Sequence, residues 1–259
     1  MSNHPYHLVD VSPWPLMSSM GLMTLTSGLI FWFNNMNLIV MNIGVFIILL
    51  TMLQWWRDII RESTFQGKHT VKVMLMMKWG MIMFILSEIM FFSSFFWSFF
   101  HSSLSPNIEI GLQWPPLGIK SFNPMNIPML NTMILLSSGV SMTWSHNSML
   151  IKNFSQAMKS MLITIMLGLY FSMLQLYEYI ESSFCMSDSI YGSTFFLSTG
   201  FHGIHVMIGT TFIIIIMLRV KNLHFSKTHH IGFEASAWYW HFVDVVWLFL
   251  YIMMYWWGG

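Results

Sequence analysis

The stretch from residue 73 to residue 100, VMLMMKWGMIMFILSEIMFFSSFFWSFF, decides the fold class of this chain. It carries only two charged side chains, Lys78 and Glu88, and contains no proline. About 20 mostly apolar residues are enough for a helix to cross a bilayer, whereas membrane-spanning strands are about ten residues long and alternate in polarity. The length of the run and its lack of alternation therefore predict a transmembrane helix.

Further apolar runs of the same kind lie on both sides of this stretch. They cover residues 16–33, 38–56, 129–151, 158–180, 191–218 and 233–257. Hydrophobic residues make up 55% of the chain and charged residues 8%, against about 25% charged in soluble domains. The sequence therefore predicts an all-α polytopic membrane protein with seven transmembrane helices. Five prolines lie in the connection 101–128, which predicts that this segment is not helical.

The basic residues are distributed unequally between the two sides that seven spans define. With the N-terminus on side A, side B receives only Lys120. The loops and span ends of side A hold Arg57, Arg61, Lys68, Lys72, Lys78, Lys152, Lys159, Arg219, Lys221 and Lys227. This asymmetry identifies side A as the cytoplasmic or matrix-like side. No Lys or Arg precedes the first span, so the chain inserts through that span or is made where it works.

Glu88 is the most informative polar residue inside a span. It follows Lys78 by ten residues, which at about 1.5 Å per residue places it about 15 Å deeper in the membrane. A charged carboxylate there is costly, and intramembrane acids usually mark functional sites. One interpretation is a proton-responsive or lipid-facing acid. The other is a structural Glu that bonds a backbone carbonyl or a neighbouring His.

His202 and His205 lie three residues apart, on one face of the predicted helix 191–218. Two imidazoles at this spacing can bind a metal or a haem. They can equally be packed in the bundle and hydrogen-bonded to a carboxylate such as Glu234 or Asp244. The second interpretation is favoured, because a metal site needs further ligands and orienting partners that the spacing does not supply.

The last predicted span carries its own polar residues. Glu234 and His241 are seven apart and share a helix face, and Asp244 lies about as deep in its span as Glu88 does. They are predicted to make interhelical hydrogen bonds that hold this span in the bundle. On side A, the basic residues of segment 55–72 and Arg219 are candidates for phospholipid headgroups; the alternative is that they serve topology alone.

Several function classes are excluded by what the sequence lacks. It contains no phosphate-binding glycine loop, no GxSxG motif and no HExxH motif. The single cysteine, Cys185, excludes an internal disulfide and any multi-cysteine metal centre. A net charge of +1 argues against nucleic acid as a partner. No residue pattern predicts a self-contained catalytic centre.

The chain resembles the cytochrome c oxidase subunit III family, in its mitochondrially encoded form. The resemblance extends from residue 4 to residue 258. The stretches that carry it are HPYHLVDVSPWPL, QWWRDIIRESTFQGKHT, FILSEIMFF, FFWSFFHSSL, YGSTFFLSTGFHGIHV and HHIGFEASAWYWHFVDVVWLFLYIMMYWWG. The segment 145–159 does not align residue by residue with the family, so its contacts are not predicted.

The resemblance implies a fold and a function. The first two helices are expected to be splayed from a five-helix bundle, which divides the chain into 1–72 and 73–259. The subunit is expected to be a non-catalytic part of an enzyme that reduces dioxygen to water and pumps protons. It would stabilise subunit I during turnover, assemble with subunits I and II and accessory subunits, and bind phospholipids such as cardiolipin. Haem a, haem a3 and copper are expected in the partner subunits, with no cofactor or metal in this chain.

Residue roles follow from the same resemblance. The expected lipid-binding residues are Arg61, His69, Glu88, Arg219 and His224, and no residue is expected to be catalytic. Five others are expected to be polar residues of the helix bundle without redox ligation: His202, His205, Glu234, His241 and Asp244. The expected location is the mitochondrial inner membrane, with the N-terminus in the matrix and the C-terminus in the intermembrane space. The competing interpretation is an independent seven-span carrier or receptor.

Overall fold

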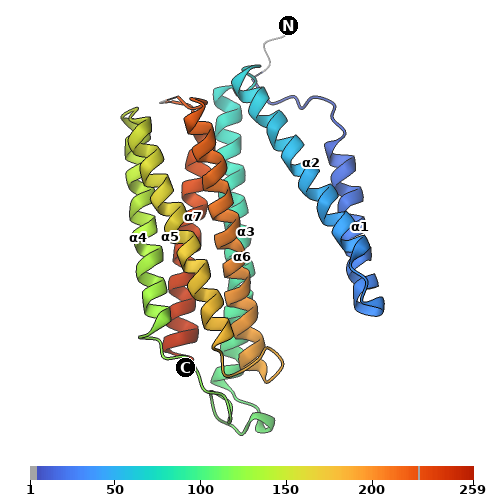
Figure 1. The fold of residues 1–259 in the computed structure, drawn as a ribbon, viewed down its shortest axis with the longest axis vertical. Helices are drawn as coiled ribbons and strands as arrows, with labels where there is room; N and C mark the ends of the chain where they lie inside the picture. The colour runs from blue at the N-terminus through green and yellow to red at the C-terminus, as the bar shows by residue number, and fades with distance from the viewer. Residues whose placement is uncertain (1–4, 227) are drawn as a thin grey trace. The chain divides into compact units, whose positions relative to one another are not determined.

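The computed structural model describes residues 5–226 and 228–259, and within them it contains seven long α-helices and no β-strand. The helices are α1 (Trp14–Asn35), α2 (Ile39–Thr64), α3 (Val71–Leu104), α4 (Ile127–Leu150), α5 (Phe154–Ile180), α6 (Ile190–Lys221) and α7 (Ile231–Leu250) (Figure 1). A π-helical segment, η2 (Tyr251–Trp256), continues α7. The all-α class and the seven helices predicted from apolar runs are confirmed.

The connection between α3 and α4 is more helical than its prolines predict. Helix α3 continues to Leu104, and a 3-10 turn, η1 (Ile108–Ile110), follows it. The side chain of Asn107 caps this turn by accepting a hydrogen bond from the backbone N–H of Ile108. Pro128 lies in the first turn of α4, where the missing N–H costs nothing because no intrahelical acceptor is available there. The prediction that 101–128 lacks helix was therefore wrong.

Six of these helices, all except α4, are long and apolar enough to cross a membrane. With 24 residues, α4 is about 36 Å long and could also span the bilayer core. Its lower hydropathy has a structural cause, because four of its serines are buried inside the protein: Ser138, Ser141, Ser145 and Ser148. Their hydroxyls bond mainly to backbone carbonyls, which removes most of the cost of placing them in an apolar environment.

The chain divides into two compact units, Met1–Met77 and Lys78–Gly259. In the first unit, α1 and α2 lie side by side as an antiparallel pair (Figure 1). The pair is unusually close at Gly28 and Gly44. A Cβ atom on Gly28 would meet the backbone of Met41, and one on Gly44 would lie 2.7 Å from Cα of Leu25. Small residues at these positions let the two backbones approach closely.

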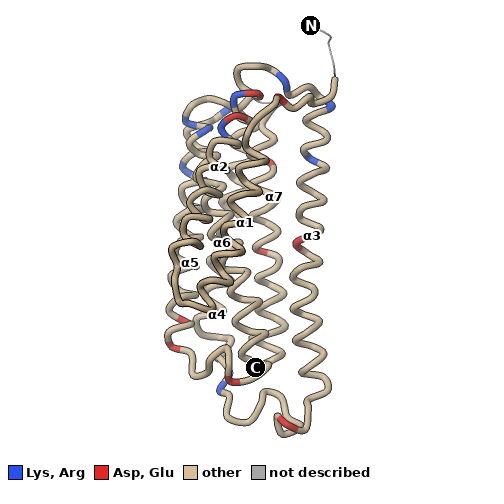
Figure 2. Tube along the Cα trace, turned by 90° about the vertical axis from the view of Figure 1, so that its right-hand side faces the viewer, with Lys and Arg blue, Asp and Glu red and all other residues tan. Residues whose placement is uncertain are grey.

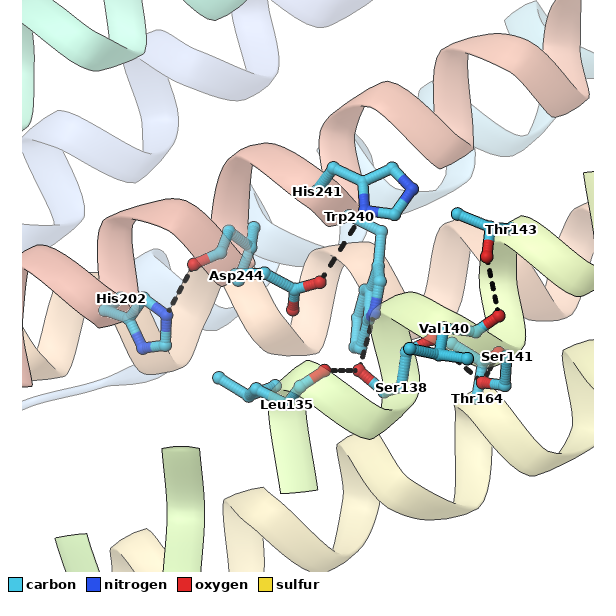
Figure 3. A network of polar contacts seen from close by, with 11 residues as sticks. Leu135, Ser138, Val140, Ser141, Thr143, Thr164, His202, Trp240, His241 and Asp244 are labelled. Atoms are coloured by element: carbon cyan, nitrogen blue, oxygen red, sulfur yellow. Dashed lines mark hydrogen bonds and ion pairs between the residues drawn. The ribbon is translucent and has the colours of Figure 1, made fainter. Parts of the chain in front are cut away.

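The second unit packs α4 to α7 and most of α3 around a core of aromatic side chains. Trp240 of α7 is fully buried, and its indole N–H donates to the hydroxyl of Ser138 on α4 at 2.9 Å (Figure 3). The same ring lies against Gly168 of α5 and Gly209 of α6. Trp240 therefore contacts three neighbouring helices of the unit.

Positive charge within the second unit gathers at one end of its helices. Lys152 and Lys159 lie at and after the α4–α5 connection, while Arg219 and Lys221 close α6. Lys120 lies in the connection between α3 and α4, at the opposite end of these helices. Figure 2 shows Lys and Arg gathered at one end of the helices of this unit. Lys227, which belongs to the same predicted basic side, is outside the described residues.

Candidate functional site

Glu88 and His205 form an ion pair or hydrogen bond between α3 and α6. The imidazole Nε2 of His205 lies 3.0 Å from Oε2 of Glu88. Its Nδ1 donates to the backbone carbonyl of Phe201 at 2.7 Å. Both side chains keep some exposure, 11% for His205 and 21% for Glu88. The second interpretation of Glu88, a structural Glu that bonds a neighbouring His, therefore agrees with this contact.

The geometry of this pair allows one proton to be shared. Since Nδ1 carries a hydrogen for Phe201, Nε2 either donates to a carboxylate or accepts from a carboxylic acid. In both cases the pair has no net charge, which suits an apolar environment. The rings of Phe92, Tyr239 and Phe242 surround the imidazole at centroid distances of 5.1 to 6.3 Å. This packing keeps the imidazole directed at Glu88.

We expect Glu88→Gln to change the free energy of unfolding of the full-length chain by less than about 1 kcal/mol, because the amide can still bond to His205. Glu88→Leu should cost about 1–3 kcal/mol, because the buried imidazole of His205 then loses its partner. Denaturant titration in detergent micelles measures both. Equal effects of the two substitutions would contradict a hydrogen bond that stabilises the fold.

Arg219 and His224 lie at the end of α6 where positive charge gathers. The Arg219 guanidinium carbon is 4.4 Å from the centroid of the Phe225 ring, which is buried. Its Nε is buried and has no hydrogen-bond partner among the described residues, and neither has Nδ1 of His224. No carboxylate in the described part of the chain pairs with Arg219. These two side chains therefore present nitrogen atoms without hydrogen-bond partners among the described residues at the same helix end.

The surroundings of Arg219 bring its guanidinium close to α7. A Cβ on Gly232, in the first turn of α7, would lie 2.8 Å from Nη1 of Arg219. His229, in the loop before α7, has its pKa lowered by burial and by the positive charge of Arg219. An anion bound near this guanidinium would complement both the charge and the free donors.

The first unit holds the other two predicted lipid contacts, Arg61 and His69. Arg61 is exposed in the last turn of α2, and no described residue pairs with its side chain. His69 is half-buried and packs edge-on against the ring of His7 at 6.1 Å. The Nε2 atom of His7 in turn lies 2.9 Å from Oε2 of Glu62, within hydrogen-bond distance. Arg61 is therefore available to an external anion.

His202 and His205 do not act as a pair in the structure. His202 is fully buried, and its Nε2 donates to the backbone carbonyl of Val243 at 3.2 Å (Figure 3). Its ring packs against those of Phe171 and Trp247, at centroid distances of 5.6 and 5.1 Å. Neither His belongs to a described group of three or more potential metal ligands. The carboxylate that meets His205 is Glu88, not Glu234 or Asp244, so the predicted partners were wrong.

The three polar residues predicted to share interhelical bonds on α7 have separate partners. Glu234 forms an ion pair with Lys78 of α3 at 2.6 Å and lies 3.3 Å from His230. Asp244 is buried, and its Oδ2 lies 3.8 Å from Nδ1 of His241, which is also on α7 (Figure 3). Of these three residues, Glu234 alone makes a side-chain ion pair with another helix among the described residues. Its partner, Lys78, was counted in the sequence analysis only as one of the basic residues of side A.

One buried acid was missed by the sequence analysis. Glu178 of α5 is 1% exposed, and neither carboxylate oxygen has a hydrogen-bond partner among the described residues. The nearby Gln175 donates weakly to the hydroxyl of Tyr255 at 3.5 Å. A signal was present, because an acid inside the predicted span 158–180 is a functional candidate by the same argument as Glu88.

The long apolar helices define a multi-pass α-helical membrane protein. Residues 4–259 match the family model described as cytochrome c oxidase subunit III. The chain belongs to the cytochrome c oxidase subunit III family. It is therefore a membrane subunit of the cytochrome c oxidase complex, which is an enzyme built from several subunits.

Individual relatives agree with the family model over their full length. The protein named cytochrome c oxidase subunit 3 from Drosophila melanogaster is 62% identical over 258 residues, which cover 100% of this chain and 98% of the relative. The protein of the same name from Anopheles quadrimaculatus is also 62% identical over 258 residues, with the same coverage. That from Heterololigo bleekeri is 58% identical over 259 residues, covering 100% of both chains.

Proposed function

We propose that the chain is a non-catalytic core subunit that binds phospholipid and stabilises subunit I while the complex reduces dioxygen to water and pumps protons. Haem a, haem a3 and copper would be held by the partner subunits, with subunit II and accessory subunits completing the assembly. Family membership supports this role over an independent carrier or receptor. The two units, Met1–Met77 and Lys78–Gly259, support a division of the chain near the proposed 72/73 boundary.

The proposed location is the mitochondrial inner membrane, with the N-terminus in the matrix and the C-terminus in the intermembrane space. The basic end of the second unit supports this orientation, because Lys and Arg are retained on the matrix-like side. Basic groups at that surface also attract anionic lipids such as cardiolipin.

The lipid proposal depends on the half-buried guanidinium of Arg219, which pairs with no carboxylate among the described residues. A cation removed from water without a counter-charge costs free energy, which an external anion can offset. A phospholipid phosphate supplies an anion and acyl chains together. Leu218 and Leu223, on either side of Arg219, are exposed by 52% and 70% and offer apolar contacts for those chains.

His224 strengthens the case for a phosphate at this place. Its buried Nδ1 lacks a partner among the described residues, and an imidazole N–H can donate to a phosphate oxygen. Glu88 in the second unit and Arg61 with His69 in the first unit are proposed as separate lipid contacts. For Glu88 the contact would use the 21% of its side chain that remains exposed.

We expect Arg219→Gln to reduce the phospholipid retained by the purified oxidase complex by one molecule, measured by native mass spectrometry and lipid extraction. Glutamine keeps the bulk and hydrogen bonding of the side chain but removes its charge. The matched control is Lys221→Gln, which removes an exposed charge two residues away and should leave the retained lipid unchanged.

Two results would contradict the proposal. Unchanged lipid content in the Arg219→Gln complex would show that the guanidinium holds no phospholipid. Equal loss in the Arg219 and Lys221 variants would show that only the general positive charge of this end matters. Arg219→Lys gives a further test, because it retains charge and should keep more lipid than the glutamine variant.

A further inference from the structure

A cluster of potential metal ligands joins the ends of α4 and α7 in the second unit. It consists of His146 on α4, His230 at the N-cap of α7, and Glu234 in the first turn of α7. One ligand atom from each of the three side chains lies within 4.8 Å of the others. His230 is 6% exposed, and the other two are half-buried. None of the residues proposed to bind lipid belongs to this cluster.

The donor set suits a divalent transition-metal ion. Two imidazole nitrogens and one carboxylate oxygen are the protein ligands of many zinc sites that keep a fourth position open. Imidazole favours zinc, copper and nickel over magnesium and calcium, which prefer oxygen ligands throughout. We propose that His146, His230 and Glu234 bind one Zn²⁺ or similar ion and so couple the ends of α4 and α7.

His230 has the partner that orients a metal-binding imidazole. Its Nδ1 donates to the backbone carbonyl of Ser226 at 3.2 Å, which directs Nε2 toward the cluster. Nε2 lies 3.3 Å from Oε1 of Glu234. A hydrogen bond from the second ring nitrogen to a carbonyl is the usual support for a metal-bound His, because it fixes the tautomer and the ring direction.

His146 is positioned by packing and has no competing hydrogen bond. Its ring stacks on Phe233 at a centroid distance of 5.8 Å and an interplanar angle of 26°. The ring centroid of His230 lies 6.2 Å away. Among the described residues, His146 makes no hydrogen bond through either nitrogen. Its lone pair is therefore available to a ligand inside the cluster.

Lys78 occupies one oxygen of Glu234 and leaves the other for a metal. The Lys78 Nζ atom is 2.6 Å from Oε2, whereas Oε1 faces His230. The lysine thus holds the carboxylate in place. The three ligand atoms lie within 4.8 Å of one another, so the longest separation must close by up to about 1.5 Å for all three to bind one Zn²⁺, since Zn–N and Zn–O bonds are about 2.0–2.2 Å long. Side-chain rotation can supply this movement at half-buried positions.

The first unit contains a second described group with metal-ligand atoms, His7, Glu62 and His69. It must be removed before binding at the α4–α7 site can be measured. We therefore use the full-length chain with His7→Ala as the reference protein. Co²⁺ serves as the probe because it adopts zinc-like geometry and absorbs visible light when bound by nitrogen and oxygen ligands.

The experiment titrates Co²⁺ into the reference protein in detergent micelles and then adds Zn²⁺. We expect a visible band that saturates at one Co²⁺ per chain and disappears when Zn²⁺ displaces it. His230→Gln and Glu234→Gln, added separately, should each weaken Co²⁺ binding by at least about tenfold. Both replacements keep side-chain volume similar, so folding can be checked by circular dichroism and gel filtration. His146→Ala should have the same effect.

The control variant is His101→Ala. It removes an exposed imidazole in the last turn of α3, whereas Lys78, which contacts Glu234, lies near the start of that helix, so the titration should be unchanged. The proposal is overturned if the reference protein gives no saturable band. It is equally overturned if folded His230→Gln and Glu234→Gln proteins bind Co²⁺ as tightly as the reference. Lipid retention is not involved, so these results are independent of the Arg219 test.

Discussion

Trp240→Ala should lower the free energy of unfolding of the full-length chain by about 3–5 kcal/mol, the range for deletion of a fully buried large aromatic side chain. The indole contacts Gly168 of α5 and Gly209 of α6 and donates a hydrogen bond to Ser138 of α4. Between membrane helices, close packing replaces much of the driving force that water supplies in soluble proteins. A cavity among three helices should therefore be especially damaging.

A graded series separates packing from hydrogen bonding. Trp240→Phe keeps most of the ring volume but leaves the buried hydroxyl of Ser138 without its donor, so it should cost about 1–3 kcal/mol. Trp79→Ala is the matched control, because Trp79 of α3 is 62% exposed and should change the free energy of unfolding by less than about 1 kcal/mol. Denaturant titration of the three variants gives the comparison. A Trp240→Ala protein as stable as the Trp79 variant would refute this account of the core.

The sequence alone predicted the elements of the fold, because each transmembrane helix is encoded by a local run of apolar residues. It also placed Glu88 and Asp244 inside spans by counting from the helix ends. Errors arose at the connection 101–128, where the prolines were taken to exclude all helix. Pro128 is accepted within the first turn of α4, because its missing N–H would have had no partner there.

Contacts between helices could not be predicted in the same way. Glu88 and His205 are 117 positions apart, and hydropathy does not specify which faces of α3 and α6 meet. The serines of α4 looked like ordinary polar residues, yet four of them are buried in the bundle. The His146–His230–Glu234 cluster depends on two separate helix ends that only the folded chain brings together. That Arg219 pairs with no carboxylate in the described part of the chain is likewise a property of the tertiary structure.

Replacing Gly28 and Gly44 should separate α1 from α2 in the first unit. A Cβ on Gly28 would lie 2.6 Å from Cα of Met41, and one on Gly44 would lie 2.5 Å from the backbone nitrogen of Leu25. In both cases the obstacle is backbone, which cannot rotate away as a side chain can. We expect Gly28→Ala to lower the free energy of unfolding by about 1–3 kcal/mol, and Gly28→Leu to lower it further.

The distance between the two helices gives a direct readout of this effect. Spin labels on Ile30 of α1 and Ile39 of α2, both exposed by more than 60%, can be introduced in a Cys185→Ser chain. Gly28→Leu and Gly44→Leu should each lengthen and broaden the measured distance distribution. Gly80→Ala is the control, because nothing lies within 4 Å of its added methyl group. That variant should leave the distance unchanged and raise stability by up to about 1 kcal/mol, since alanine is the better helix former. An unchanged distribution in the Gly28→Leu protein would mean that the close approach of α1 and α2 does not depend on glycine.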